Sequence, residues 1–180
     1  VFFKGCPLRC VWCHNPETQN FKKQILTNRE KCVGCGACAR ICPHDAISMV
    51  DGKAVTDHSR CTGCGTCVYA CLLNIREVAG KKYTVQELVT ELRKAEMFYE
   101  QSGGGVTFSG GEVMSVDMDF VLAAAKELDR QGISLTIDTC GYAPYERFQK
   151  ILPYVDTFLY DVKIMDPELH KKYIGVDNKL

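Results

Sequence analysis

The sequence has no excess of charge of either sign and no long apolar run. Lys plus Arg and Asp plus Glu number 22 each, so the charge balance indicates neither nucleic acid nor a membrane surface as a partner. No apolar segment approaches the roughly 20 residues that cross a bilayer, and no secretion signal is visible. We therefore expect no nucleic acid and no membrane among the partners of this chain.

The sequence also lacks an initiator Met and an element that closes the fold. It begins within Val1-Phe2-Phe3, which we interpret as the second half of a strand, and stops at Leu180 soon after a helical pattern. We expect a fragment of a longer globular protein, since the apolar fraction is 46% and the charged fraction 24%.

Cysteine, in contrast, is abundant, with 12 in 180 residues. All but one fall into three tight groups, and neighbours two residues apart suit a shared metal centre better than several disulfides. Without a secretion signal, this usage predicts a reducing, anaerobic cytoplasm.

The pattern divides the chain into three parts. Residues 1–30 hold a short strand and a Cys-bearing loop, residues 31–80 form a block rich in Cys and Gly, and residues 81–180 alternate helices and strands. Within the block, the run Cys32 to Cys38 is echoed by the run Cys61 to Cys67. The block has little apolar mass, so we expect cluster binding to supply the stability that its core does not.

The last hundred residues predict a βα rhythm. Thr84 and Glu87 form a capping box at the start of a helix. Further segments read as strands at 106–108, 133–138 and 155–163, and as helices at 116–131, at 145–152 and after Pro167. This predicts an α/β fold, part of a (βα)-repeat barrel, with its active site at the carboxyl ends of the strands. The polar candidates there are Ser109-Gly110-Gly111-Glu112, Asp138-Thr139, and Asp161 with Lys163.

Cys6, Cys10 and Cys13 have the spacing C-x3-C-x2-C directly after a strand. Three thiolates hold three irons of a [4Fe–4S] cubane and leave the fourth iron open, as a catalytic metal site requires. Trp12 stands where its ring would shield the cluster or pack against a ligand. The alternative is a zinc or structural three-Cys site.

The Cys- and Gly-rich block contains the spacing C-x2-C-x2-C-x3-C twice, which is the ligand run of bacterial ferredoxins, and in this arrangement the fourth Cys of each run ligates the other cluster. The predicted ligand sets are Cys32, Cys35, Cys38 and Cys71 for one cluster, and Cys61, Cys64, Cys67 and Cys42 for the other. Closed clusters of this kind move electrons, although paired C-x2-C motifs also bind zinc. With the three-Cys loop, the prediction is three [4Fe–4S] clusters.

A strand, then C-x3-C-x-aromatic-C, then a βα series resembles the radical S-adenosylmethionine (SAM) superfamily. The resemblance implies that the amino and carboxylate groups of SAM chelate the open iron. It also implies that an electron from the cluster cleaves the sulfonium, releasing methionine and a 5′-deoxyadenosyl radical. Gly110-Gly111-Glu112 is similar to the family's GGE(P) motif, which receives the methionine amino group, with Val113 in place of the usual Pro.

Nearly the whole chain also resembles a narrower group, the glycyl-radical enzyme activating enzymes. The residues that carry it are Cys6-Pro7-Leu8-Arg9-Cys10, Trp12-Cys13-His14-Asn15-Pro16-Glu17, Thr107-Phe108-Ser109-Gly110-Gly111-Glu112, Asp138-Thr139-Cys140-Gly141-Tyr142 and Asp161-Val162-Lys163. The pyruvate formate-lyase activator of this group lacks the two-cluster insert. The chain therefore looks closer to activators of enzymes that handle glycerol, choline, aromatic acids or related substrates.

This resemblance implies that the radical abstracts a hydrogen from the Cα of a glycine in a partner glycyl-radical enzyme. Electrons would come from a flavodoxin or ferredoxin through the ferredoxin-like insert. Asp138 and Thr139 would contact SAM, and Asp161, Val162 and Lys163 would line its pocket, with Lys163 as partner of its carboxylate. Asp138 and Asp161 would also hold a cation, or else be solvated strand-end acids.

Two other functions remain open: a radical enzyme that acts directly on a small molecule or peptide, and a plain electron carrier. For Cys140, the lone cysteine, we favour a packed residue over a redox participant. We expect His14 to cap or hydrogen-bond the Cys loop, and we assign no function to His44, His58 or His170.

Overall fold

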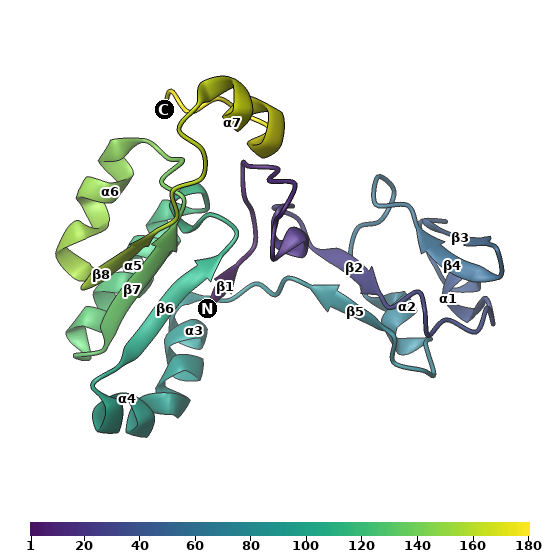
Figure 1. The fold of residues 1–180 in the computed structure, drawn as a ribbon. Coiled ribbons are helices and arrows are strands. Elements are labelled where there is room, and N and C mark those ends of the chain that lie inside the picture. Colours follow the sequence, from purple (N-terminus) through teal and green to yellow (C-terminus); the bar gives the residue numbers. More distant parts are fainter. The chain divides into compact units, whose positions relative to one another are not determined.

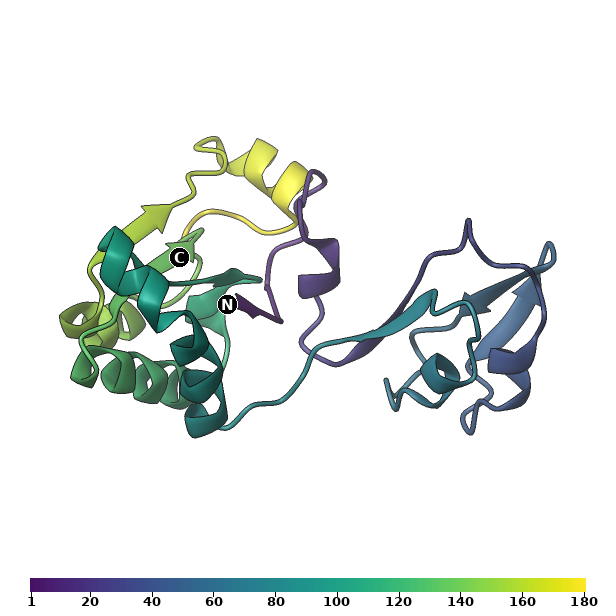
Figure 2. The same cartoon turned by 90° about the horizontal axis from the view of Figure 1, so that it is seen from below.

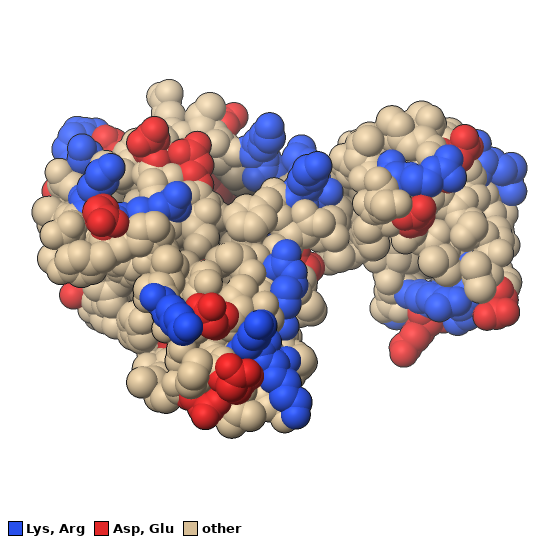
Figure 3. Space-filling view, turned by 90° about the horizontal axis from the view of Figure 1, so that it is seen from above, with Lys and Arg blue, Asp and Glu red and all other residues tan.

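The computed structural model describes all residues from Val1 to Leu180, and they form two compact units. The first, here called the sheet unit, comprises Val1–Phe21 and Lys82–Leu180, and the second, the Cys-rich unit, comprises Lys22–Lys81 (Figure 1). Lysine, arginine and acidic side chains are interspersed on the face of each unit that Figure 3 shows. No helix is long and apolar enough to cross a membrane.

The sheet unit is built on four parallel strands in the order β1-β6-β7-β8. Their bounds are Phe2–Phe3 for β1, Gly105–Gly110 for β6, Ser134–Thr139 for β7 and Thr157–Tyr160 for β8. The register aligns their carboxyl ends, because Phe3 pairs with Gly110 and Thr139 pairs with Tyr160. The predicted α/β fold with a parallel sheet is therefore confirmed.

The helices of this unit follow the βα rhythm that the sequence indicates. They are α3 (Val85–Leu92), α4 (Glu96–Ser102), α5 (Met118–Arg130), α6 (Tyr145–Ile151) and α7 (Pro167–Ile174), with short 3-10 helices at Pro16–Thr18, Arg93–Ala95, Val113–Ser115 and Leu152–Tyr154. The capping box is present, because the Thr84 hydroxyl accepts from the Glu87 backbone N–H at 3.2 Å and the Glu87 carboxylate accepts from the Thr84 backbone N–H at 2.8 Å. The helix predicted over 116–131 begins later, at Met118, because Asp117 accepts from backbone N–H groups of the first turn and is the N-cap.

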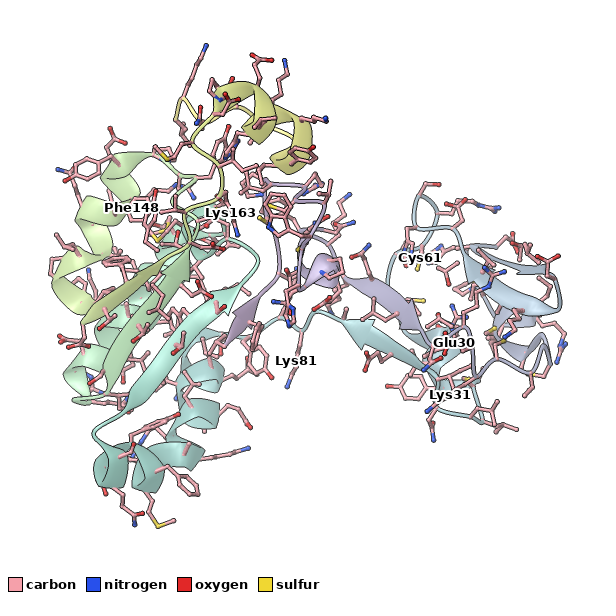
Figure 4. The ribbon with its side chains drawn as sticks, in the orientation of Figure 1. Glu30, Lys31, Cys61, Lys81, Phe148 and Lys163 are labelled. Atoms are coloured by element: carbon pink, nitrogen blue, oxygen red, sulfur yellow. The ribbon has the colours of Figure 1, made fainter.

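The core lies between the sheet and the helices on one of its faces, where α5 and α6 pack (Figure 2). Phe108 and Ile137 on the strands and Leu128 on α5 have no exposed surface. On α6, the ring of Phe148 lies 6.1 Å from that of Phe158 between centroids (Figure 4). Since side chains alternate along a strand, the neighbours Ser109 and Asp138 belong to the opposite face of the sheet.

The Cys-rich unit holds two small antiparallel ladders. In one, β2 (Gln24–Thr27) pairs with β5 (Arg76–Ala79), and in the other, β3 (Ile47–Val50) pairs with β4 (Lys53–Thr56). One-turn helices α1 (Ala37–Arg40) and α2 (Thr66–Tyr69) follow the second Cys of each run. Pairing with β5 brings β2 into this unit, so the unit starts at Lys22 and not at residue 31 as the sequence pattern indicates.

The apolar cluster of the Cys-rich unit is small. Its buried members are Ile25, Cys38, Ala54 and Cys67, half of them cysteines. Such a core buries little apolar area, and the hydrophobic contribution to the stability of this unit is correspondingly small.

Candidate functional site

A cavity of about 550 Å³ opens where the strands of the sheet unit end. Its walls come from the Cys loop and from the segments after β6, β7 and β8. The lining residues are Phe2, Cys6, Leu8, Cys10, Trp12, Cys13, His14, Asn15, Thr18, Ser109, Gly110, Gly111, Asp138, Thr139, Cys140, Asp161 and Lys163. The three loop cysteines and most of the predicted SAM-binding residues therefore line the same cavity.

The Cys loop is held against the end of β6 by backbone contacts. The N–H of Gly111 donates to the carbonyl of Phe3, and the N–H of Glu112 donates to the carbonyl of Gly5, both at 2.8 Å. A Cβ on Gly111 would lie 2.2 Å from the Gly5 carbonyl oxygen, closer than non-bonded atoms approach. A glycine is therefore required at position 111 by the close approach of two backbones.

The three loop cysteines influence one another electrostatically. Burial raises the pKa of the Cys6 thiol, and Glu112 and the thiols of Cys10 and Cys13 raise it further. Burial also raises the pKa of Cys10, against the opposing charge of Lys163. In this chain no three His, Cys, Asp or Glu side chains converge as they would around a single metal ion. In a cubane each thiolate binds a different iron, so such convergence is not required.

Glu112, one of the predicted SAM contacts, is a buried residue whose carboxylate is surrounded by hydrogen-bond donors. Its side chain has no exposed surface and does not line the cavity. One carboxylate oxygen accepts from the Thr139 hydroxyl at 2.6 Å and the Met114 N–H at 2.9 Å. The other accepts from the N–H and the thiol of Cys140, both at 2.8 Å. Glu112 therefore ties the end of β6 to the end of β7, and contact with SAM stays a prediction.

Two polar pairs border the cavity. The Ser109 hydroxyl donates to Asp138 at 2.7 Å, and Lys163 forms an ion pair with Asp161. Burial lowers the pKa of Lys163, but the hydrogen bond and charge of Asp161 outweigh it and the net direction is upward. Figure 4 shows Lys163 just past the end of β8. A fixed ammonium at this position is suited to bind a carboxylate.

The remaining predicted residues divide between two cavities. Trp12 lines the main cavity, and its ring lies 6.3 Å from that of Tyr173 between centroids. Val162 is 64% exposed and lines only a neighbouring cavity of about 320 Å³. Cys140 lines both cavities, and burial raises the pKa of its thiol, as does Glu112.

Sequence reasoning gave no site role to four residues that line the main cavity: Phe2, Leu8, Asn15 and Thr18. The only feature of the sequence that could have identified them is their position, because each lies within a few residues of a predicted ligand or at a strand end. His170, to which the sequence gave no function, is buried, and its Nδ1 lies 2.6 Å from the carbonyl oxygen of Val176.

A further cavity of about 170 Å³ lies within the Cys-rich unit. It is lined by all four cysteines of the first predicted set, Cys32, Cys35, Cys38 and Cys71, together with Arg76 and small or apolar residues. The fourth Cys of the second run therefore lies beside the first three of the first run. The other set forms no cavity of its own among those observed.

The donor atoms around these sulfurs fit iron–sulfur ligation. Backbone N–H groups donate to cysteine sulfurs, from Ala46 to Cys42 at 3.4 Å and from Ala54 to Cys32 at 3.5 Å. Such bonds lower the pKa of Cys32, and the Thr66 hydroxyl lowers that of Cys64. They favour the thiolate, which is the form that binds a cluster. All twelve cysteines are free of disulfides.

Two protein-family models match the chain. A 4Fe-4S dicluster domain matches residues 31–75, and the Radical SAM superfamily matches residues 58–179. The two matches support iron–sulfur clusters and SAM as cofactors.

Curated relatives match almost the entire chain. The trans-4-hydroxy-L-proline dehydratase activating enzyme of Clostridioides difficile is 53% identical over 180 residues, covering 100% of this chain and 60% of the relative. The choline trimethylamine-lyase activating enzyme of Oleidesulfovibrio alaskensis is 43% identical, covering 100% of this chain and 59% of the relative. The benzylsuccinate synthase activating enzyme of Thauera aromatica is 38% identical, covering 97% and 54%. The chain thus spans less than two thirds of their length, and the likeness to activating enzymes is confirmed.

Proposed function

We propose that this chain, which belongs to the Radical SAM superfamily, is part of an activating enzyme that cleaves SAM reductively and installs a radical on a glycine of a partner enzyme. The observation that carries the proposal is the cavity at the carboxyl ends of the strands, where three loop cysteines face Ser109, Gly110, Asp138 and Lys163. The relatives' names support it, since each is an activating enzyme for another enzyme.

Within this cavity, the thiolates of Cys6, Cys10 and Cys13 would hold a cluster and leave one of its irons without a protein ligand. When bound and reduced, the cluster would supply the electron for cleavage of the sulfonium of SAM to methionine and the 5′-deoxyadenosyl radical. Lys163, positioned by Asp161, binds the SAM carboxylate, and the partly buried backbone of Gly110 and Gly111, which lines the cavity, receives its amino group.

The acidic residues at the strand ends act as polar walls of this cavity. Asp138 accepts from Ser109, and Asp161 is paired with Lys163. Because both carboxylates already have protein partners, we favour this role over a cation site between them.

We further propose that the Cys-rich unit is a ferredoxin-like insert with two closed clusters, which bring the total to three. The shared cavity of Cys32, Cys35, Cys38 and Cys71 supports the exchange of fourth ligands between the two runs. In this scheme a flavodoxin or ferredoxin in a reducing cytoplasm donates electrons to the insert. We also propose that the four parallel strands of the sheet unit belong to a (βα)-repeat barrel.

The test uses the full-length protein, reconstituted with iron and sulfide under anaerobic conditions, reduced and mixed with SAM. We expect wild-type protein to release 5′-deoxyadenosine and Cys10→Ala to release none, because the variant lacks one of the three ligands. Addition of the candidate glycyl-radical partner then yields a glycine-centred signal in electron paramagnetic resonance (EPR).

The alternative functions give different results. Release of 5′-deoxyadenosine without a radical on any such partner would indicate direct action on a small molecule or peptide. Absence of product from a fully reconstituted, reduced wild-type protein would leave an electron carrier.

A further inference from the structure

Arg76 is a buried cation inside the Cys-rich unit. It is the first residue of β5, and only 3% of its surface is exposed to solvent. It also lines the cavity of the first cysteine set. Neither the cluster motifs nor the proposed function assigns it a role.

The guanidinium has few partners. One terminal nitrogen, Nη2, donates to the Thr56 hydroxyl at 2.5 Å, and the other, Nη1, lies 3.6 Å from the sulfur of Cys38. Nε is buried and has no partner, and no carboxylate forms an ion pair with Arg76. A charge buried in this way requires compensation by a nearby opposite charge. Apart from the Thr56 hydroxyl, the polar group that faces the guanidinium here is the Cys38 sulfur.

Arg76 also lies near the second predicted cluster set. Its guanidinium is within hydrogen-bond reach of the Cys67 side chain. Cys38 and Cys67 lie in the same buried cluster and belong to different predicted ligand sets. The guanidinium is therefore adjacent to one ligand of each set.

The internal repeat shows that packing does not demand an arginine here. In the first half of the repeat, the position equivalent to Arg76 is Ile47, which begins β3 as Arg76 begins β5. Ile47 is partly buried against the apolar cluster. The repeated fold thus accepts an aliphatic side chain at this position, and the second half replaces it with a cation.

We propose that Arg76 is the shared counter-charge of the two clusters and that it makes both easier to reduce. One electron from an external low-potential donor converts a [4Fe–4S]²⁺ cluster to [4Fe–4S]⁺, with no bond or proton exchanged. A buried positive charge stabilises the added negative charge, since net charge and hydrogen bonds to sulfur set cluster potentials. The inference rests on the two-cluster assignment and not on activation of a glycyl-radical enzyme.

The experiment isolates these two clusters in the full-length protein. Replacement of Cys6, Cys10 and Cys13 by Ala removes the loop cluster, and the remaining clusters are titrated with reductant and followed by EPR. In this background Arg76→Ile introduces the residue of the repeat, Arg76→Lys keeps the charge, and the control Arg40→Ile removes an exposed guanidinium that donates to the Cys35 carbonyl at 3.1 Å.

We expect Arg76→Ile to lower the reduction equilibrium constant at least about tenfold, or about 59 mV for a one-electron couple. Arg76→Lys should stay within about threefold of wild type and Arg40→Ile within about twofold, because water screens an exposed charge. Equal shifts for Arg76→Ile and Arg40→Ile, or for Arg76→Ile and Arg76→Lys, would overturn the proposal.

Loss of clusters in the variants is also decisive. If Arg76→Ile binds no iron while Arg76→Lys binds it with a potential near wild type, a positive charge at this position is needed for the clusters to form at all, and this result supports the role of Arg76 as counter-charge. If Arg76→Lys also fails to bind iron or has a tenfold lower constant, the shape of the arginine matters and the proposal is wrong. A wild-type background without two clusters would instead refute the two-cluster assignment.

Discussion

Replacement of Glu112 by Gln tests whether this carboxylate holds the site together or contacts the ligand. All four neighbours within hydrogen-bond distance are donors, two for each oxygen. A glutamine amide keeps one oxygen and presents an NH₂ group to the other pair of donors. In either orientation, the NH₂ group faces one backbone N–H, of Met114 or of Cys140, whose hydrogen bond is lost. The hydroxyl or thiol beside it must turn to accept, and the remaining hydrogen bonds no longer go to a charged group.

The expected effect of Glu112→Gln is large. Hydrogen bonds to a charged group contribute about 1.5–3 kcal/mol each, and the site is fully buried. Allowing for relaxation, we expect the free energy of unfolding to fall by about 3–5 kcal/mol, a substantial share of the roughly 5–15 kcal/mol typical of a domain. Urea unfolding of the full-length apoprotein, followed by circular dichroism, measures it.

Asp138→Asn is the matched control. Asp138 lines the cavity and accepts one hydrogen bond, from Ser109, which an Asn oxygen also accepts. We expect a change in stability below about 1 kcal/mol and weaker SAM binding by the reconstituted protein. A Glu112→Gln protein with wild-type stability and a selective loss of SAM affinity would refute the anchoring role.

Two further substitutions test the Cys loop and the exchange of ligands between the cysteine runs. Gly111→Ala places a Cβ 2.2 Å from the Gly5 carbonyl oxygen and should cost about 1–3 kcal/mol by overpacking, with loss of one cluster's share of bound iron. Gly132→Ala, where a Cβ meets nothing within 4 Å despite a φ of +70°, should cost about 1 kcal/mol and keep all iron. Equal iron binding by both variants would contradict the role of the Gly111–Gly5 contact in holding the Cys loop. Cys71→Ala should abolish the EPR signal of one Cys-rich cluster, and unchanged iron content and signal would contradict its place in the first ligand set.

Local signals predicted much of the sheet unit. The capping box at Thr84 involves groups three residues apart, and its prediction is confirmed at the start of α3. Alternating helices and strands also predicted parallel pairing, because such connections join parallel strands. In contrast, α4 (Glu96–Ser102) was not predicted, since it follows α3 with no capping signal of its own.

Contacts between residues that are far apart in the chain could not be predicted from the sequence. The carboxylate of Glu112 contacts Cys140 across 28 positions, and a Gly-Gly-Glu motif does not reveal whether its acid faces the cavity or the core. β2 was missed because its partner β5 lies some fifty residues later and neither strand is longer than four residues. The burial of Arg76 was equally hidden, because an arginine is ordinarily exposed.

The pairing of β2 with β5 has a consequence for evolution. Gln24 and Ala79, near the two ends of the Cys-rich unit, are partners in one ladder, so the chain enters and leaves this unit through neighbouring points. Deletion of everything between them would leave two ends that a short turn joins, at a small cost in loop closure. The unit is therefore a module that a single deletion would remove while the two flanking segments stay joined.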